Sequence, residues 1–320
     1  MTVELTAPFP YFGGKRRAAP MIWDALGDPG GYVEPFCGSA AALLARPPAK
    51  GRRVETINDA DGWLVNAWRS IQLSPSDVAA HAHGPVTEID YHARLAWLQE
   101  RRTPDLVAWL EGDPEAHDAK AAAWWLYVCA CGIGDPWGPG PWRVVDEHLR
   151  DTRHLGNAGR GVNRELPHLG NAGKLDGYMH ALAMRLARVR ITCGDWQRVL
   201  KPSVIRATAG NSTIGVLLDP PYSTSGDLYA TTNTGQHQDI SAQVREWATD
   251  NGTNYRIVLC GFDDEHDELL GHGWRKEIGR AGGGAGYNTD GRAGRRERLW
   301  LSPSCVETAL ALDFTEEVSP

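Results

Sequence analysis

The sequence lacks several features that would place the protein in a particular class. No stretch approaches the roughly eighteen uninterrupted apolar residues that a membrane span needs. The first residues show no basic region followed by an apolar one, so we expect no secretory signal. The six cysteines form no CxxC pair, which predicts reduced thiols and a cytoplasmic setting. The formal net charge of -7 argues against indiscriminate coating of nucleic acid but is compatible with a local basic face.

What is present is the composition of an ordinary globular protein. The 320 residues are 42% hydrophobic and 23% charged, and this length suits one large domain or a core domain with an insertion. Short apolar segments alternate with helical ones at both ends of the chain and predict a mostly parallel, doubly wound α/β sheet. The seven expected strands are residues 30–36, 52–59, 190–194, 214–219, 254–262, 273–279 and 296–302. Helices are expected at 39–46, with Ser39 as the N-cap, at 62–72 and at 240–252.

The middle of the chain does not follow this alternation. Helical segments are followed there by an irregular stretch, 132–174, in which HLGNAG occurs twice. We therefore expect an inserted region at 74–188, between the second and third strands, and a main domain formed by 1–73 and 189–320. A long irregular stretch is disordered or binds a ligand, and its tryptophans favour binding. The expected helices are 88–102, 103–112 and 117–132, and the residues expected to bind are Trp137, Trp142, Arg143, Arg150, Arg153, Arg160 and Arg164.

The segment VEPFCGSAA, residues 33–41, predicts a strand that enters a helix through a tight turn. Such a turn places backbone N–H groups and a helix N-terminus beside a ligand. It has one glycine, Gly38, where the dinucleotide pattern GxGxxG has three, so it suits a nucleoside without phosphates better. Asp59 ends the next strand, where an acid meets ribose hydroxyls. The alternative is a structural turn with a capping serine and a solvated acid.

Two further segments have a ligand-binding and a structural interpretation. In GDW, Asp195 is placed to accept from an adenine amino group and Trp196 to pack on the ring; alternatively, Asp195 caps a helix. In PYFGGKRR, Tyr11 and Lys15 flank two glycines and are placed to contact an aromatic ligand and an acidic site. The phosphate-loop pattern GxxxxGK[ST] is absent, and a simple N-terminal turn with a solvated lysine is the alternative.

The segment IGVLLDPPY raises the sharpest chemical hypothesis. A buried strand ends at Asp219, and the ligands of open α/β sheets lie beyond the carboxyl ends of the strands. Pro220 and Pro221 force a stiff turn whose carbonyl oxygens no backbone donor claims. A carboxylate, a carbonyl and the ring of Tyr222 then suit a planar base that carries an amino group. Positioning and polar acceptors suffice for catalysis, so no metal or covalent nucleophile is expected.

A glycine-rich segment between the last two expected strands, residues 280–298, carries a cluster of arginines. A mobile cationic loop suits phosphate contacts, and a solvated flexible hairpin is the alternative. The arginines are Arg280, Arg292, Arg295, Arg296 and Arg298.

Taken in order, YFGGK, EPFCGSAA, ND, GDW and DPPY resemble the Dam-like DNA adenine methyltransferases, the alpha group of amino-methyltransferases. The resemblance covers residues 8–73 and 190–302. It implies a Rossmann-like, seven-stranded S-adenosylmethionine-dependent methyltransferase sheet with an antiparallel last strand, and a target-recognition region inserted before the third strand. The family often has glycine where Ala40 stands and phenylalanine where Trp196 stands, and neither change removes a functional group.

The resemblance also implies roles for individual residues. The cofactor S-adenosylmethionine would contact Tyr11, Lys15, Glu34, Phe36, Gly38, Ser39, Asp59, Asp195 and Trp196, and catalysis would lie with Asp219, Pro220, Pro221 and Tyr222. DNA would be held by Trp137, Trp142, Arg143, Arg153, Arg160, Arg164, Arg292, Arg295 and Arg296.

The implied function is site-specific adenine-N6 methylation of double-stranded DNA in a bacterial or phage-infected cell. The target adenine must leave the duplex to be reached. Three alternatives stay open: RNA adenine methylation, DNA cytosine-N4 methylation, and a catalytically inactive nucleic-acid-binding module. The sequence also leaves open the target sequence, a link to restriction and the oligomeric state. By resemblance, the Asp at the first position of DPPY favours adenine as the methylated base.

Overall fold

A computed structural model describes most of the chain, and for residues 142–145 and 148–151 it describes the backbone alone. Within these parts, no helix combines the length and hydropathy that a membrane crossing requires. The described residues are 5–9, 11, 14–48, 51, 53–84, 87–101, 105–113, 115–131, 142–145, 148–151, 172–209, 212–221, 237–278 and 296–307.

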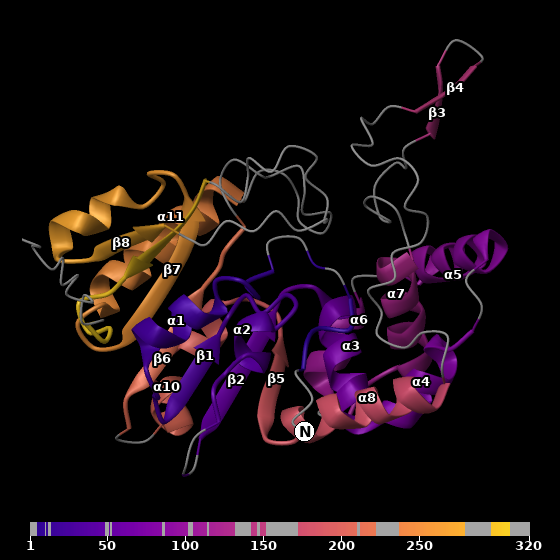
Figure 1. Ribbon diagram of the computed structural model, residues 1–320, viewed down its shortest axis with the longest axis horizontal. Coiled ribbons are helices and arrows are strands. Elements are labelled where there is room, and N and C mark those ends of the chain that lie inside the picture. The colour runs from indigo at the N-terminus through magenta and orange to yellow at the C-terminus, as the bar shows by residue number, and fades with distance from the viewer. Residues whose placement is uncertain are drawn as a thin grey trace, which may run out of the picture.

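The protein is built on a mixed seven-stranded sheet with the strand order β5-β2-β1-β6-β7-β9-β8 (Figure 1). The strands are β1 Gly31–Glu34, β2 Val54–Asp59, β5 Val189–Cys193, β6 Ile214–Leu218, β7 Arg256–Phe262, β8 Arg275–Ile278 and β9 Glu297–Leu301. The first five strands of the order are parallel. The last strand of the sequence, β9, is antiparallel to both of its neighbours. The predicted α/β sheet with an antiparallel last strand is therefore confirmed.

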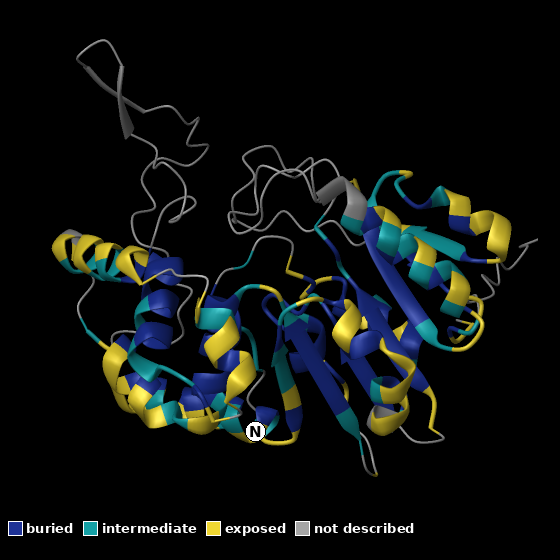
Figure 2. Ribbon diagram, turned by 180° about the vertical axis from the view of Figure 1, so that it is seen from behind, coloured by how far each residue is buried: buried dark blue, intermediate teal, exposed yellow. Residues whose placement is uncertain are grey.

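The central strands are buried on both faces because their apolar residues alternate between two cores. In β6 every residue is buried: Leu217 faces the larger core, around Trp23 and Trp68, while Val216 and Leu218 face the smaller core, around Trp274. Two-sided burial is what makes strands of parallel sheets read as continuous apolar runs. Figure 2 shows this belt of buried strands between partly exposed helices.

Helices cover the sheet on both faces. The larger core takes side chains from α1 Ala19–Leu26, α2 Ala41–Leu44 and α3 Gly62–Leu73. The smaller core takes them from α9 Gln197–Leu200, α10 Pro202–Ala209, α11 His237–Asn251 and the 3-10 helix η1 Asp267–His272. The expected helix at 39–46 forms only over four residues, and its N-cap is Ala40 with no side-chain capping bond, so the prediction of Ser39 as N-cap was wrong. Gly38 and Ala40 both have positive φ, which places the helix start after Ser39.

Within the described residues, five helices lie between α3 and β5 in addition to a short hairpin. They are α4 Pro75–Ala82, α5 Glu88–Glu100, α6 Asp105–Gly112, α7 Ala119–Cys131 and α8 Ala172–Leu186, with β3 Trp142–Val145 and β4 His148–Asp151 forming the hairpin. The hairpin lies within 132–174, which the sequence predicted to be irregular. α7 packs against α3, α4 and α5, and α8 packs against α3 and α4. The larger core therefore continues from the sheet into these helices.

Candidate active site

The sheet has a topological switch point between β1 and β6. From β1 the chain moves to β2 on one side, and it later returns through β6 on the other side of β1. In open α/β sheets the connections diverge at such a point and leave a crevice at the carboxyl ends of the strands. Glu34 is the last residue of β1 and Asp219 directly follows β6. Two carboxylates therefore stand at the position where this fold binds ligands.

Lys15 brings a positive charge between carboxylates from two other segments. Its Nζ lies 2.7 Å from Oδ2 of Asp219 and 3.0 Å from Oε1 of Glu297, the first residue of β9. The lysine side chain is 4% exposed, whereas those of Asp219 and Glu297 are 19% and 20% exposed. The structure thus places Lys15, which we expected at an acidic site, on the carboxylate of Asp219. No motif in the sequence indicates Glu297.

The N-terminal segment packs onto the turn between β1 and α2. Gly38 has a φ of +44°, and a Cβ placed there would lie 2.4 Å from Cε1 of Tyr11. A Cβ on Gly14 would lie 3.2 Å from Oγ of Ser39. Tyr11, Gly14 and Lys15 thus join this turn to Asp219, and glycine is required where the Tyr11 ring meets the backbone.

Glu34 is a buried acid, 3% exposed, that accepts a 3.0 Å hydrogen bond from the hydroxyl of Tyr32. Burial raises the pKa of its carboxyl to about 8, the Tyr32 hydrogen bond opposes this rise, and the negative charge of Asp219 adds to it. At neutral pH the carboxyl is therefore largely protonated and can donate as well as accept. Glu34 is therefore a largely neutral, buried polar group near the ion pair of Lys15 and Asp219.

Asp59 connects the ends of β1 and β2. One carboxylate oxygen accepts from the backbone N–H of Gly38 and the other from that of Asp61, each at 3.0 Å. Burial raises the pKa of the Asp59 carboxyl to about 6, and these two backbone hydrogen bonds oppose the rise. Asp61 in turn accepts from the N–H of Trp63 at 2.9 Å and caps α3. The predicted ribose-binding acid is thus fixed beside the glycine turn.

Asn58, next to Asp59, holds the carboxyl ends of three strands together. Its amide nitrogen donates to the carbonyl oxygens of Pro35 at 3.1 Å and Gly194 at 3.0 Å. Its amide oxygen accepts from the hydroxyl of Thr192 at 2.9 Å. Sequence reasoning assigned no role to Asn58, although a buried polar side chain inside an apolar strand is a signal of such a role.

Two aromatic rings, from different strand ends, meet at the same edge. The ring centroids of Phe36 and Trp196 are 5.8 Å apart and their planes are tilted by 30°. Trp196 is 5% exposed. Asp195 is exposed, and its carboxylate accepts from the backbone N–H of Gln197 at 2.8 Å. The N-cap of α9 is Trp196, with no side-chain capping bond, so Asp195 stands one residue before the cap that the sequence offered as its alternative role.

The segment DPPY, residues 219–222, is described only as far as its second proline. Asp219 is partly exposed, Pro220 is buried and Pro221 is partly buried, and Tyr222 lies outside the described residues. The polypeptide leaves the sheet here, because the ladder between β6 and β7 ends with the pair Leu218 and Leu259. This is the position expected for the end of the strand.

Most residues predicted to hold DNA lie outside the described part of the chain. They are Trp137, Arg153, Arg160, Arg164, Arg292 and Arg295. Trp142 and Arg143 lie on β3, where their backbones pair with those of Asp151 and Arg150. Arg296 forms an ion pair with Asp263, and its guanidinium lies 5.3 Å from the centroid of the Phe262 ring.

No family model matches this chain. No curated protein matches it either. The function is therefore inferred from the site itself.

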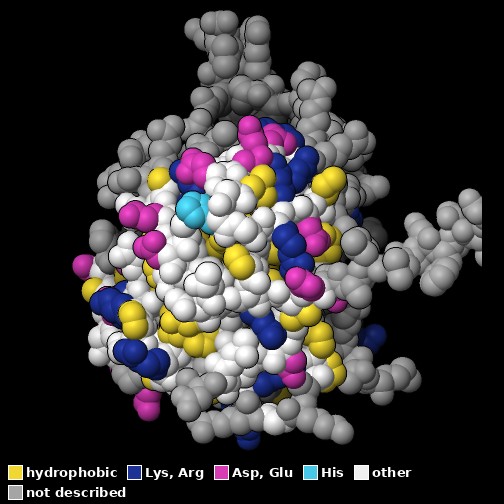
Figure 3. Space-filling model, turned by 90° about the vertical axis from the view of Figure 1, so that its left-hand side faces the viewer, with side chains coloured by type: hydrophobic (Ala, Val, Ile, Leu, Met, Phe, Trp, Pro, Cys, Tyr) yellow, Lys and Arg dark blue, Asp and Glu magenta, His cyan; other side chains and the backbone are white. Residues whose placement is uncertain are grey.

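Among the described residues, no group of three or more His, Cys, Asp or Glu side chains is arranged to hold a metal ion. On the face that carries β8 and α11, the described acidic and basic side chains are interspersed (Figure 3).

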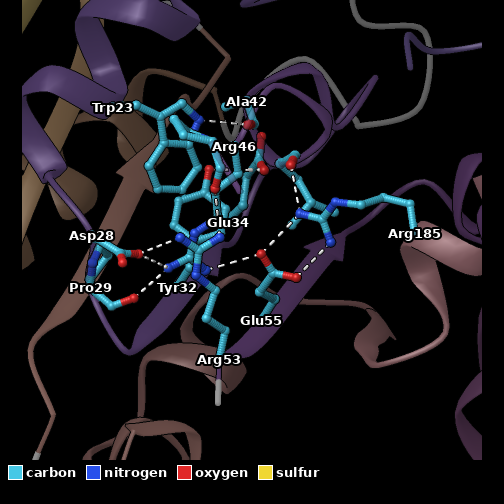
Figure 4. A network of polar contacts seen from close by, with 12 residues as sticks. Trp23, Asp28, Pro29, Tyr32, Glu34, Ala42, Arg46, Arg53, Glu55 and Arg185 are labelled. Atoms are coloured by element: carbon cyan, nitrogen blue, oxygen red, sulfur yellow. Dashed lines mark hydrogen bonds and ion pairs between the residues drawn. The ribbon is translucent and has the colours of Figure 1, made fainter. Parts of the chain in front are cut away.

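A buried polar network lies behind Glu34 (Figure 4). The guanidinium of Arg46 lies 5.9 Å from the centroid of the Tyr32 ring, and its Nη1 donates to Glu55 at 3.0 Å. Arg185, on α8, binds both oxygens of Glu55, at 2.7 and 2.9 Å. Glu55 therefore receives two guanidinium groups, one from α8 and the other from the segment that follows α2. The network therefore connects Tyr32, the hydrogen-bond donor to Glu34, to α8 of the inserted region.

Proposed function

We propose that this protein transfers the methyl group of S-adenosylmethionine to the 6-amino group of adenine in DNA. The observation that carries the proposal is the meeting of Glu34, the Gly38 turn, Asp59 and Asp219 at the switch point of the sheet. Their order along the chain is that of the motifs that resemble the Dam-like methyltransferases. The seven-stranded sheet with its antiparallel last strand is compatible with this family.

The residues at the edge of the sheet fit the proposed cofactor. The Asp59 carboxylate lies beside the open, glycine-bearing turn and is suited to ribose hydroxyls. Phe36 and Trp196 form an apolar surface against which an adenine ring can pack. When bound, S-adenosylmethionine supplies an electrophilic methyl group.

The proposed catalytic role of Asp219 is to orient the amine of the target base. Its carboxylate accepts one amino hydrogen, and a carbonyl of the diproline turn accepts the other. The nitrogen lone pair, which is otherwise delocalised into the ring, is then directed at the methyl carbon. S-adenosylmethionine, held beside Asp59, Phe36 and Trp196, would supply the methyl group, and the acceptor hydrogen-bonded to the amine would pass the proton that the amine loses to water.

DNA binding in this proposal rests on base flipping and phosphate contacts. Extruding the adenine costs roughly a few kcal/mol, which stacking on Tyr222 and the hydrogen bond to Asp219 would offset. Arginines of the inserted region and of 280–298 would contact phosphates, so affinity would decrease as salt concentration rises. Identifying the methylated nucleoside after digestion distinguishes DNA adenine from RNA adenine and DNA cytosine.

The test is Asp219→Ala with tritiated cofactor and DNA of mixed sequence. We expect methyl transfer to fall by at least about a hundredfold, since a lost polar contact in a transition state has such an effect. Heat of cofactor binding should persist in the variant. Asp250→Ala, an exposed change near the end of α11, serves as the control and should leave transfer unchanged. Undiminished transfer in Asp219→Ala refutes the catalytic assignment, and a wild type that neither binds the cofactor nor methylates DNA refutes the proposal.

A further inference from the structure

We propose that Glu297 is a positioning residue for Asp219 and acts through Lys15. The inference rests on the function proposed above and adds a residue that no sequence motif marks. Three segments meet at the Lys15 ammonium: the N-terminal turn, the end of β6 and the start of β9. Each of them contributes one charged group.

The backbone fixes where these three groups stand. The carbonyl oxygen of Lys15 accepts from the N–H of Ala19 at 2.8 Å, so the lysine is anchored to the first turn of α1. Glu297 pairs with Phe262 in the antiparallel ladder between β9 and β7. Asp219 directly follows β6, which lies beside β7 in the sheet, on the side opposite β9. The side chains therefore meet because β6 ends and the antiparallel β9 begins at the same edge of the sheet, on either side of β7, and small displacements of β9 would move the ammonium.

Charge balance explains why two carboxylates are needed. An ammonium that is 4% exposed has lost most of its water and requires anionic neighbours. With carboxylate oxygens at 2.7 and 3.0 Å, its charge is divided between Asp219 and Glu297. Asp219 thereby keeps part of its strength as a hydrogen-bond acceptor. Neutralising Glu297 would direct the ammonium more completely to Asp219, which would then accept the substrate amine less well.

The test compares methyl transfer by Glu297→Gln, Glu297→Asp and wild type. We expect Glu297→Gln to lower kcat about tenfold, the effect of weakening one hydrogen bond to a charged group, with KM for the cofactor changed less than about twofold. Glu297→Asp, which restores the charge, should recover part of the loss. Glu277→Gln is the matched control, because Glu277 lies on the neighbouring strand β8 and pairs with Leu299, two residues from Glu297. It should retain the wild-type kcat.

The outcomes separate this inference from the proposed function. An active wild type together with an unaffected Glu297→Gln overturns the positioning role and leaves the proposed function intact. A wild type without methyl transfer overturns both the function and the role that Glu297 has in it. Equal losses in Glu277→Gln and Glu297→Gln overturn the positioning role, because they show a general effect of charge removal from this strand pair.

A second measurement does not depend on activity. In protein labelled with nitrogen-15 and carbon-13, couplings through hydrogen bonds should connect the Lys15 ammonium to the side-chain carboxyl carbons of both Asp219 and Glu297. In Glu297→Gln the correlation to Asp219 should persist and strengthen. Absence of the Glu297 correlation in the wild type overturns the sharing of the ammonium, and with it the inference.

Discussion

The backbone N–H of Gly38 donates a 3.0 Å hydrogen bond to the carboxylate of Asp59. This bond joins the turn that follows β1 to the last residue of β2, so the two strand ends form one unit. It also directs the carboxylate towards the glycine turn. Any change that moves the turn will therefore also move the residue proposed to hold the cofactor ribose.

Gly38→Ala is expected to disrupt this unit. The φ of +44° is unfavourable for alanine, and its Cβ would lie 2.4 Å from Cε1 of Tyr11. We expect the free energy of unfolding to fall by about 2 kcal/mol or more, because strain and a core clash add. Cofactor binding should weaken at least about tenfold, since a displaced turn moves the backbone N–H that donates to Asp59. Urea unfolding and calorimetry measure the two effects.

Gly177→Ala is the control for that prediction. Gly177 lies within α8, and a Cβ there has no described neighbour within 4 Å. Alanine is favoured over glycine in helices, so this change should stabilise the protein by about 0.5–1 kcal/mol. If both variants unfold like the wild type, the turn tolerates a side chain and the conformational requirement at Gly38 is wrong.

Glu34 should make stability depend on pH in a characteristic direction. The pKa of its carboxyl is about 8 in the folded protein and 4.5 ordinarily, so between these values the folded state binds more protons than the unfolded state. The stability that Glu34 contributes is complete below pH 4.5 and is lost as pH rises towards 8, at about 1 kcal/mol per pH unit.

Glu34→Gln tests this directly, since glutamine is neutral and close in shape to the protonated acid. Near pH 5 the variant should have a free energy of unfolding within about 1 kcal/mol of the wild type, as expected for an isosteric change that keeps hydrogen bonds. From pH 5 to 8 the wild type should lose stability relative to the variant. Other groups, such as Asp59, titrate in both proteins and cancel in the difference. Parallel curves across this range would show that Glu34 is ionised in the folded state.

Glu55→Gln should be strongly destabilising. Glu55 neutralises Arg46 and Arg185, and the side chain of Arg46 is only 1% exposed. Removing the charge leaves guanidinium groups without their shared partner, so we expect a loss of about 3–4 kcal/mol in the free energy of unfolding. Denaturant unfolding measures it. Glu100→Gln removes an exposed acid that lies 3.7 Å from Arg101, and it should cost less than about 1 kcal/mol. Similar losses of unfolding free energy in both variants would contradict the larger contribution to stability that we assign to the buried network.

The centre of the sheet could be predicted from the sequence because strands such as β6 are short and apolar on both faces. The segment IGVLL, which forms β6, has no polar residue and is flanked by Thr213 and Asp219. Such a run can form only a buried strand or a short buried helix. The alternation of these runs with helical segments along the chain favours the strand. The last strand was found in the same way, since RLWL supplies the apolar residues of β9.

The partners within the site were much harder to predict. Lys15 and Asp219 belong to motifs, but Glu297 belongs to none, and only the antiparallel placement of β9 brings it to the ammonium. Ser39 has the residue type of an N-cap, yet the left-handed conformation of Ala40 moves the helix start past it. Local propensity therefore indicated the elements, whereas contacts between distant segments were decided by the topology of the sheet.

The helices of the inserted region share their apolar core with the sheet, and α7 and α8 both pack against α3, the helix that follows β2. Arg185 adds an ionic attachment of α8 to β2. Exchanging the region 74–188 for that of another protein would remove the helices that pack against α3 and would remove Arg185, a partner of Glu55. A working chimera would have to carry α3 and Arg185 along with the transplanted helices, so the unit for grafting begins after the end of β2, at Gly62, and not at residue 74.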